Sequence, residues 1–272
     1  TPFAFLAVRF AIVAAIFAAI SVIVAVWRHQ RKMAQSASPA ITRRALSGTI
    51  CVGLLLHGFY LGCSFYAMAH GLGAALTALI VSTQPLLTTA LAITLFGEKP
   101  RAVQWLGIAI GFIGVVVVLS PSLDSAMPTL PLLSSLTALL AITGGTLLQK
   151  KIGHQIGLLH SNAIQATAAT LFFVLLIHTI EVPHIDWTAG FIGALAWQVL
   201  VVSTGAYIIL MILIKRDSVA ATTSLLFLVP PTTALIANIW LAEPLTPVTL
   251  AGFGMASAGV FLVTRYATNP NS

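Results

Sequence analysis

Arg9 is the one cation that lies well inside a long apolar run of the 272-residue sequence. A guanidinium in such a place can bind a carboxylate through two parallel hydrogen bonds. At the rise of a helix, Arg9 also lies only about 10 Å from the nearer end of its run, within reach of snorkelling to the surface. Both roles are open, and the short distance favours the structural one.

Other polar residues recur at helical spacing inside the apolar runs, which marks the helix faces that avoid hydrocarbon. His57, Tyr60 and Ser64 fall at i, i+3 and i+7 on one such face. Packing between helices explains any single one of these residues as well as substrate contact does. Taken together, the residues predicted to line a substrate cavity are Arg9, His57, Tyr60, Ser64, Thr77, Gln84, Thr88, Gln165, Gln198, Tyr207, Phe227 and Asn238.

Acidic side chains avoid the middle of the apolar runs. Glu98 and Glu243 sit at run ends, and the other four acidic residues are in or next to connections. A proton relay through carboxylates is therefore poorly supported. If protons are involved, His57 or His178 would have to titrate.

Enzyme chemistry is also disfavoured. The sequence contains neither Gly-x-Ser-x-Gly nor His-Glu-x-x-His, and His57 and Ser64 would be about 10 Å apart on a helix, beyond hydrogen-bond reach. We therefore predict no catalytic residues, no metal site and no cofactor.

The composition excludes a soluble globular protein, because 58% of the residues are hydrophobic and only 7% are charged. A bilayer core of about 30 Å needs about 20 apolar helical residues. Runs of this kind are too long for strands, so they predict an all-α polytopic membrane protein. The nine runs are at about Phe3–Val26, Ser47–Ala69, Ala74–Phe96, Ala102–Ser120, Leu130–Gln149, Leu159–Ile180, Ala189–Ile214, Ser218–Leu241 and Pro247–Arg265.

Basic residues gather on one side of these runs. Every Lys and Arg except Arg9 lies after the first run, in alternate connections after it, or at the end of the last run. Because translocation disfavours basic loops, that side is predicted to be cytoplasmic, together with the C-terminus. This placement also argues against nucleic acid as a partner, and it makes the lipid bilayer the expected surrounding.

The chain matches itself at an offset of 145 residues, which pairs Pro85 with Pro230 and Glu98 with Glu243. The two copies would face opposite sides of the membrane, as in the inverted repeats of many secondary transporters. The first half has one run fewer than the second. We therefore expect nine helices of a ten-helix protein, with the first helix of the first five-helix unit absent and the repeats at 1–124 and 125–272.

Several motifs resemble the EamA-like family of the drug/metabolite transporter superfamily, whose members have two inverted five-helix units. The segment Thr1–Phe10, with its Arg, resembles the second helix of that family. The other matching motifs are Phe65–Ala69, Gln84–Pro85 through Gly97–Glu98, Gln104–Gly107, Pro230 through Glu243, and Gly252. The nearest type is the YddG-type amino-acid exporters of bacterial inner membranes. The resemblance implies a central cavity and a small-molecule substrate, with amino acids the best expectation and another metabolite or drug the alternative.

Pro85, Pro230 and Pro231 lie near the middle of their runs, where proline removes a helical hydrogen bond and predicts a kink or break. We interpret them as hinges for alternating access, although kinks without a function are common in membrane helices. Glu98 and Glu243 are predicted to mark helix ends or to close the cavity as gates. With no acid in mid-span, export down the solute's own gradient is the simpler mechanism.

Glycine seams occur on two runs, at Gly107-x-x-x-Gly111-x-x-Gly114 and from Gly252 to Gly259. Such seams let helix backbones approach closely, and they predict scaffold contacts in preference to a dimer face, with a monomer and a homodimer both open. A channel would need a continuous polar lining, and neither an enzyme nor a scaffold protein needs an inverted repeat. Transport remains the favoured function.

Overall fold

The computed structural model describes residues 1–30, 41–96, 101–123, 129–152, 155–206, 209 and 229–265. Within these ranges all regular structure is helical, and described helix overlaps each of the nine predicted runs. In the described part of the chain, six helical stretches are long and apolar enough to cross a membrane, and Ala102–Val118 and Ala189–Gly205 are shorter apolar helices. The prediction of an all-α polytopic membrane protein is confirmed. The elements are α1 (Pro2–Gln30), α2 (Arg43–Gly53), η1 (Leu54–Phe59), α3 (Tyr60–Ala69), α4 (Ala74–Ser82), α5 (Gln84–Phe96), α6 (Ala102–Leu123), α7 (Thr129–Ile152), α8 (Leu158–Thr179), α9 (Ala189–Ala196), η2 (Trp197–Gly205), α12 (Val229–Leu241) and α13 (Pro247–Arg265).

The helices form two compact units that do not coincide with the two halves of the sequence. Unit 1 contains residues 1–62 and 144–211, and unit 2 contains residues 63–143 and 212–272. Each unit therefore combines helices from the predicted repeats 1–124 and 125–272.

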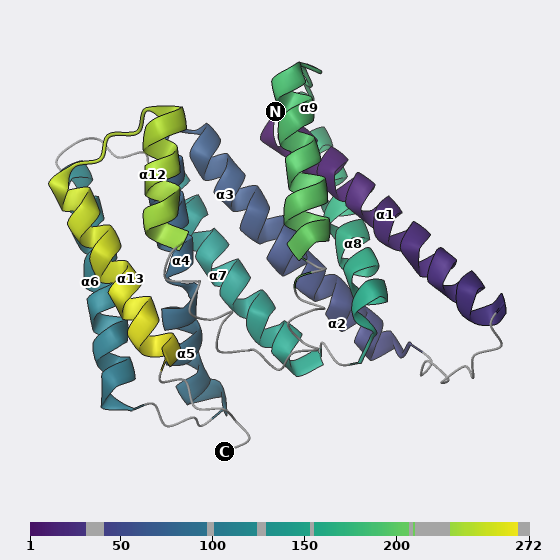
Figure 1. The fold of residues 1–272 in the computed structure, drawn as a ribbon, viewed down its shortest axis with the longest axis horizontal. Helices are drawn as coiled ribbons and strands as arrows, with labels where there is room; N and C mark the ends of the chain where they lie inside the picture. The colour runs from purple at the N-terminus through teal and green to yellow at the C-terminus, as the bar shows by residue number, and fades with distance from the viewer. Residues whose placement is uncertain are drawn as a thin grey trace. The chain divides into compact units, whose positions relative to one another are not determined.

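Unit 1 is built on helix α8, which packs against α1 and against the α2–η1 segment (Figure 1). Phe173 of α8 is fully buried and stacks on Phe3 and Phe10 of α1, with ring centroids 6.2 and 6.1 Å away. Glycine allows the contact between α2 and α8, because a Cβ atom at Gly53 would lie 2.6 Å from the Cα atom of Gln165. The backbones of α2 and α8 thus approach closely beside a buried amide.

Unit 2 contains the seam between α6 and α13, which lie side by side in Figure 1. A Cβ atom at Gly107 would lie 2.9 Å from the carbonyl oxygen of Gly259, and one at Gly114 would lie 2.7 Å from that of Gly252. The predicted glycine seams therefore contact each other within one chain. The contacts of Gly107 with Gly259 and of Gly114 with Gly252 show that the two helices run antiparallel. At the offset of 145 residues Gly107 corresponds to Gly252 and Gly114 to Gly259, so the two contacts are equivalent.

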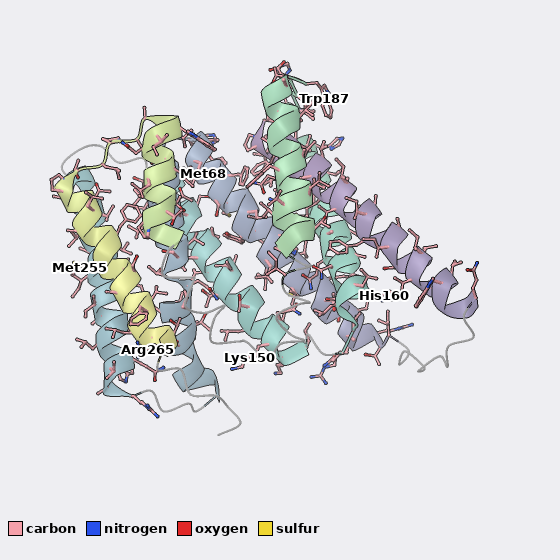
Figure 2. All side chains as sticks on the ribbon, viewed as in Figure 1. Met68, Lys150, His160, Trp187, Met255 and Arg265 are labelled. Carbon is pink, nitrogen blue, oxygen red and sulfur yellow. The ribbon has the colours of Figure 1, made fainter. Side chains whose placement is uncertain are left out.

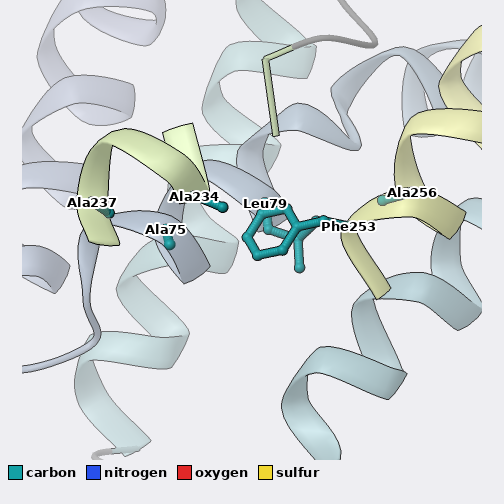
Figure 3. Close-up of a cluster of buried hydrophobic side chains, with 6 residues drawn as sticks. All are labelled: Ala75, Leu79, Ala234, Ala237, Phe253 and Ala256. Carbon is teal, nitrogen blue, oxygen red and sulfur yellow. The ribbon is translucent and has the colours of Figure 1, made fainter. Parts of the chain in front are cut away.

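A second core in unit 2 joins α4, α12 and α13. Figure 3 shows the Phe253 ring of α13 against Leu79 of α4, with small alanines completing the cluster. Phe253 is 2% exposed and Leu79 is 0% exposed. The alanines are Ala75, Ala234, Ala237 and Ala256.

The third predicted run is broken where the sequence indicates. Helix α4 ends at Ser82, Thr83 forms a turn, and α5 begins at Gln84. Pro85 therefore lies in the first turn of α5, where its missing N–H is tolerated. The buried Thr83 hydroxyl donates to the Ile80 carbonyl oxygen at 2.6 Å and closes the end of α4.

Charged and aromatic side chains mark several helix ends (Figure 2). Lys150 and Lys151 occupy the last turn of α7, and Arg265 occupies the last turn of α13. Cations are favourable at these carbonyl-rich ends. Trp187 precedes α9 and is 61% exposed, as expected of a residue at the membrane interface.

Candidate functional site

Arg9 of α1 is buried, with only 5% of its surface exposed. Its Nη2 atom donates to the Ser203 hydroxyl at a long 3.3 Å, and its Nε atom is buried without a hydrogen-bond partner. The guanidinium carbon lies 5.1 Å from the centre of the Phe10 ring. The side chain is enclosed by protein and does not reach out to the surface as snorkelling would require.

His57 and Tyr60 approach Arg9 from the η1–α3 segment. Arg9 interacts electrostatically with both of them. The His57 ring also packs on Phe10, with centroids 5.2 Å apart, and shares a hydrogen bond with Gln165. These contacts bring together four of the predicted cavity residues in unit 1.

Gln165 extends this cluster along α8. Its Nε2 atom donates to the Ser161 hydroxyl at 2.9 Å and to Gln149 Oε1 at 3.1 Å. Gln165 is 5% exposed and Ser161 is 3% exposed. A buried amide at this position needs such partners. We call Arg9, His57, Tyr60, Gln165 and Ser203 the Arg9 cluster.

Two π-helical segments position the Arg9 cluster. Segment η1 carries His57 and ends directly before Tyr60, whose N–H donates to the carbonyl oxygen of Leu55. Segment η2 carries Ser203, and the predicted residue Gln198 is half-buried in the same segment. Because π segments inside helices frequently occur at functional sites, their presence on both sides of Arg9 supports a functional reading.

The predicted residues of unit 2 are bonded locally. The Thr77 hydroxyl donates to the Gly73 carbonyl oxygen, and the Gln84 amide donates to the Thr88 hydroxyl at 3.2 Å. The amide of Asn238 donates to the Glu243 carbonyl oxygen at 2.8 Å. Ser64 is buried in α3. These residues belong to a different unit from the Arg9 cluster, so the predicted set falls into two groups.

Glu243 caps a helix from the other sequence repeat. Its carboxylate accepts hydrogen bonds from the N–H groups of Ala74 at 2.6 Å and Ala75 at 3.0 Å. These groups are at the start of α4, where backbone N–H groups have no partner within the helix. Glu243 therefore caps the start of α4 and not the helix that it follows.

Some predicted residues lie outside the described part of the chain, namely Tyr207, Phe227 and Glu98. Pro230 and Pro231 are the second and third residues of α12, and the residues directly before Val229 are not described.

His178 is exposed, and its Nδ1 lies 2.7 Å from the Val174 carbonyl oxygen of its own helix. Among the described residues, His, Cys, Asp and Glu form no group of three that could hold a metal ion.

Sequence reasoning missed three polar members of the site: Ser203, Ser161 and Gln149. Ser203 lies beside Thr204 within the apolar run Ala189–Ile214, so its polarity was a signal that the sequence offered. Ser161 is one helical turn before Gln165, and the same rule of helical spacing finds it. Gln149 is 16 residues from Gln165 on a different helix, and spacing within one helix does not predict that contact.

Comparison with solved structures supports the fold. One protein crystal structure has a TM-score of 0.67 with this chain at 18% sequence identity, covering 98% of this chain and 88% of that chain. At this identity the likeness concerns the fold alone.

Two curated relatives are uncharacterized transporters. The chain is 28% identical to the uncharacterized transporter YvbV of Bacillus subtilis over 194 residues, which are 71% of this chain and span 63% of YvbV. It is 27% identical to the uncharacterized inner membrane transporter YedA of Escherichia coli strain K12 over 226 residues, which are 81% of this chain and 72% of YedA. A shorter match, 42% identical over 52 residues, links 19% of this chain to 18% of a probable terminal-alkyne amino-acid exporter of Streptantibioticus cattleyicolor.

Family comparison covers nearly the whole chain. The model of the EamA-like transporter family matches residues 1–120 and, separately, residues 129–265. The first match lies within residues 1–124 and the second within residues 125–272. This multi-pass membrane protein therefore belongs to the EamA-like transporter family.

Proposed function

We propose that the protein exports small metabolites across the bacterial inner membrane. The observation that carries this proposal is the match of both halves of the chain to the EamA-like transporter family. The relative YedA is an inner membrane transporter, and the basic side of the helices agrees with a cytoplasmic C-terminus. Transport of another small metabolite or of a drug is the alternative within the same superfamily.

Amino acids are the proposed substrates. The 42% identical segment shared with a probable amino-acid exporter supports this class. The Arg9 cluster also supports it, because a cation, an imidazole and an amide can bind the charged and polar ends of a small solute. The surrounding phenylalanine rings of α1 and α8 suit a solute that is partly apolar.

The proposed mechanism is alternating access by inverted repeats that move around a central cavity. The interruption between α4 and α5 at Thr83, close to Pro85, supports one hinge, and Pro230 is the counterpart of Pro85 at the offset of 145 residues. In the described residues no acidic side chain pairs with Arg9, and movement of solute down its own gradient needs no carboxylate relay.

Counterflow in liposomes tests the function. The intact protein is reconstituted with one amino acid inside, and the entry of the same radiolabelled amino acid is measured for each of the twenty in turn. We expect at least one to enter faster than in protein-free liposomes. If none does, and a panel of drug-like cations does enter, the alternative substrate class replaces amino acids.

A further inference from the structure

We propose that Arg9 is an anion site that binds the carboxylate group of the transported solute. This inference rests on the proposed function, and it narrows the substrate class to small monocarboxylates. The carrying observation is that Arg9 is 5% exposed and that one hydrogen-bonding edge of its guanidinium is incompletely used.

The unused hydrogen-bonding capacity lies along one edge of the guanidinium. Its Nε atom is buried and has no partner, and Nη2, on the same edge, makes one long bond of 3.3 Å to Ser203. A carboxylate can accept from both atoms at once in a bidentate pair. Leaving such groups unpaired in a buried place costs free energy, so an anionic ligand would remove a cost that the ligand-free protein bears.

The unbalanced positive charge of Arg9 also favours an anionic ligand. Within the described ranges, no acidic side chain forms an ion pair with Arg9, and the hydrogen-bond acceptor of its Nη2 atom is the neutral Ser203 hydroxyl. Charged groups inside membrane proteins are expensive and typically pair or line a solute pathway. A ligand with one negative charge would balance this cation.

Neighbouring side chains favour a carboxylate over a larger anion. Ser203 brings one hydroxyl to the edge of the guanidinium, while Phe10 covers the cation with an aromatic ring. Phe10 in turn contacts the rings of His57 and Phe173. One cation among aromatic rings suits a singly charged headgroup with an apolar body, and it offers little to a phosphate with two charges.

The placement of the site fits a role in a moving structure. Ser203 lies in η2 and His57 lies in η1, so π-helical segments hold two of the neighbours of Arg9. Such segments are local departures from regular helix that recur at functional positions. The same helices would be free to shift when a ligand replaces the long bond to Ser203.

The first experiment compares each transported amino acid with its amide, which keeps the amine and side chain but lacks the carboxylate. Competition is measured in counterflow with the wild type, Arg9→Gln, Arg9→Lys and Arg44→Gln, the last being an exposed arginine on α2 that serves as the control. We expect the wild type and Arg44→Gln to prefer the acid, and Arg9→Gln to lose about 10- to 100-fold in affinity for the acid with little change for the amide. Arg9→Lys recovers only part of the preference, because lysine cannot form the bidentate pair.

A stability measurement separates this site from a structural role. Thermal unfolding in detergent is followed without ligand for the same four proteins. Since Arg9 is buried without an acidic partner, its neutralisation leaves the ligand-free melting temperature unchanged or raises it. A melting temperature lowered in Arg9→Gln, together with an unchanged preference for acid over amide, overturns the proposal.

A second set of probes keeps the inference testable if no amino acid is transported. Straight-chain monocarboxylates from acetate to octanoate, and chloride, are added to the wild type and to Arg9→Gln, and the shift in melting temperature is recorded. Stabilisation of the wild type alone by monocarboxylates supports the site even though amino-acid export has failed. The proposal is overturned if neither amino acids nor monocarboxylates stabilise the wild type, or if chloride alone does so through Arg9.

Discussion

At the scale of the residue, the Glu243 carboxylate connects segments that are 168 and 169 residues apart in the chain. Its two oxygens accept from successive N–H groups at the start of α4, and the negative charge faces the positive end of the helix dipole. Gly73 precedes this turn with a φ of +82°, a conformation that glycine adopts without strain. The capping interaction thus joins the two sequence repeats within unit 2.

Replacing Glu243 with alanine should destabilise the protein by about 1 kcal/mol, because two helix N–H groups lose their acceptor. Glu243→Gln retains one acceptor oxygen and should cost less. Thermal unfolding in detergent and hydrogen exchange of the Ala74 and Ala75 amides measure the effect. Asp186→Asn, at a side chain that is 72% exposed in a loop, is the matched control and should change little. Equal exchange at Ala74 and Ala75 in Glu243→Ala and wild type would contradict the cap.

Polar residues at helical spacing show what spacing can and cannot predict. Spacing groups His57 with Tyr60, and in the structure both lie near Arg9. It also selected Thr77 and Asn238, whose side chains bond within or near their own helices. A polar residue in an apolar run must find a partner, but its spacing does not say whether that partner is a ligand or the nearest carbonyl oxygen.

At the scale of the element, the sequence predicted the interruption near Pro85 but not the π segments η1 and η2. Proline has a local effect that is the same in any helix. A π segment adds one residue to a helical turn, and whether it is stable depends on the contacts that the shifted side chains make with other helices. In η1, Gly58 lies against the Phe172 ring, and a Cβ atom at Gly58 would be 3.0 Å from it. Such a contact across helices has no counterpart in local sequence.

A Pro85→Ala, Pro230→Ala double variant tests the hinge interpretation. Alanine at both positions restores helical N–H donors and favours a continuous helix, so we expect slower counterflow with an unchanged or higher melting temperature. Pro247→Ala is the control, because Pro247 is exposed and begins α13, where proline is tolerated. Normal counterflow in the double variant would remove the hinge argument.

The α6–α13 seam gives a prediction with a control on the same helix. At Gly259 an added Cβ would lie 2.5 Å from the Gly107 carbonyl oxygen, whereas at Gly254 it would meet nothing within 4 Å. Gly259→Ala should therefore destabilise the protein by about 1–3 kcal/mol through overpacking. Gly254→Ala should be neutral or slightly stabilising, since alanine favours helix. Both are measured by thermal unfolding in detergent, and equal melting temperatures would mean that the seam does not hold α6 against α13.

At the scale of the whole molecule, the predicted inverted repeat would account for the contact between α6 and α13, which correspond at the offset of 145 residues. Gly107 and Gly114 of α6 correspond to Gly252 and Gly259 of α13, and the antiparallel contacts 107–259 and 114–252 are equivalent under that exchange. The repeat was visible in the sequence through its Pro, Glu and Gly residues. The division into units that mix both halves was not, because it depends on which helix faces meet.

The orientation in the membrane is the last prediction, and it follows from the placement of Lys and Arg. Single cysteines are introduced at Gln155, His184 and Thr246, which are all exposed, in a parent with Cys51→Ser and Cys63→Ser. Basic connections remain on the cytoplasmic side, and Gln155 follows Lys150 and Lys151 in such a connection. We therefore expect a membrane-impermeant thiol reagent to label His184→Cys and Thr246→Cys on intact cells, and Gln155→Cys only after permeabilisation. The reverse pattern would place the C-terminus outside and would contradict the predicted orientation.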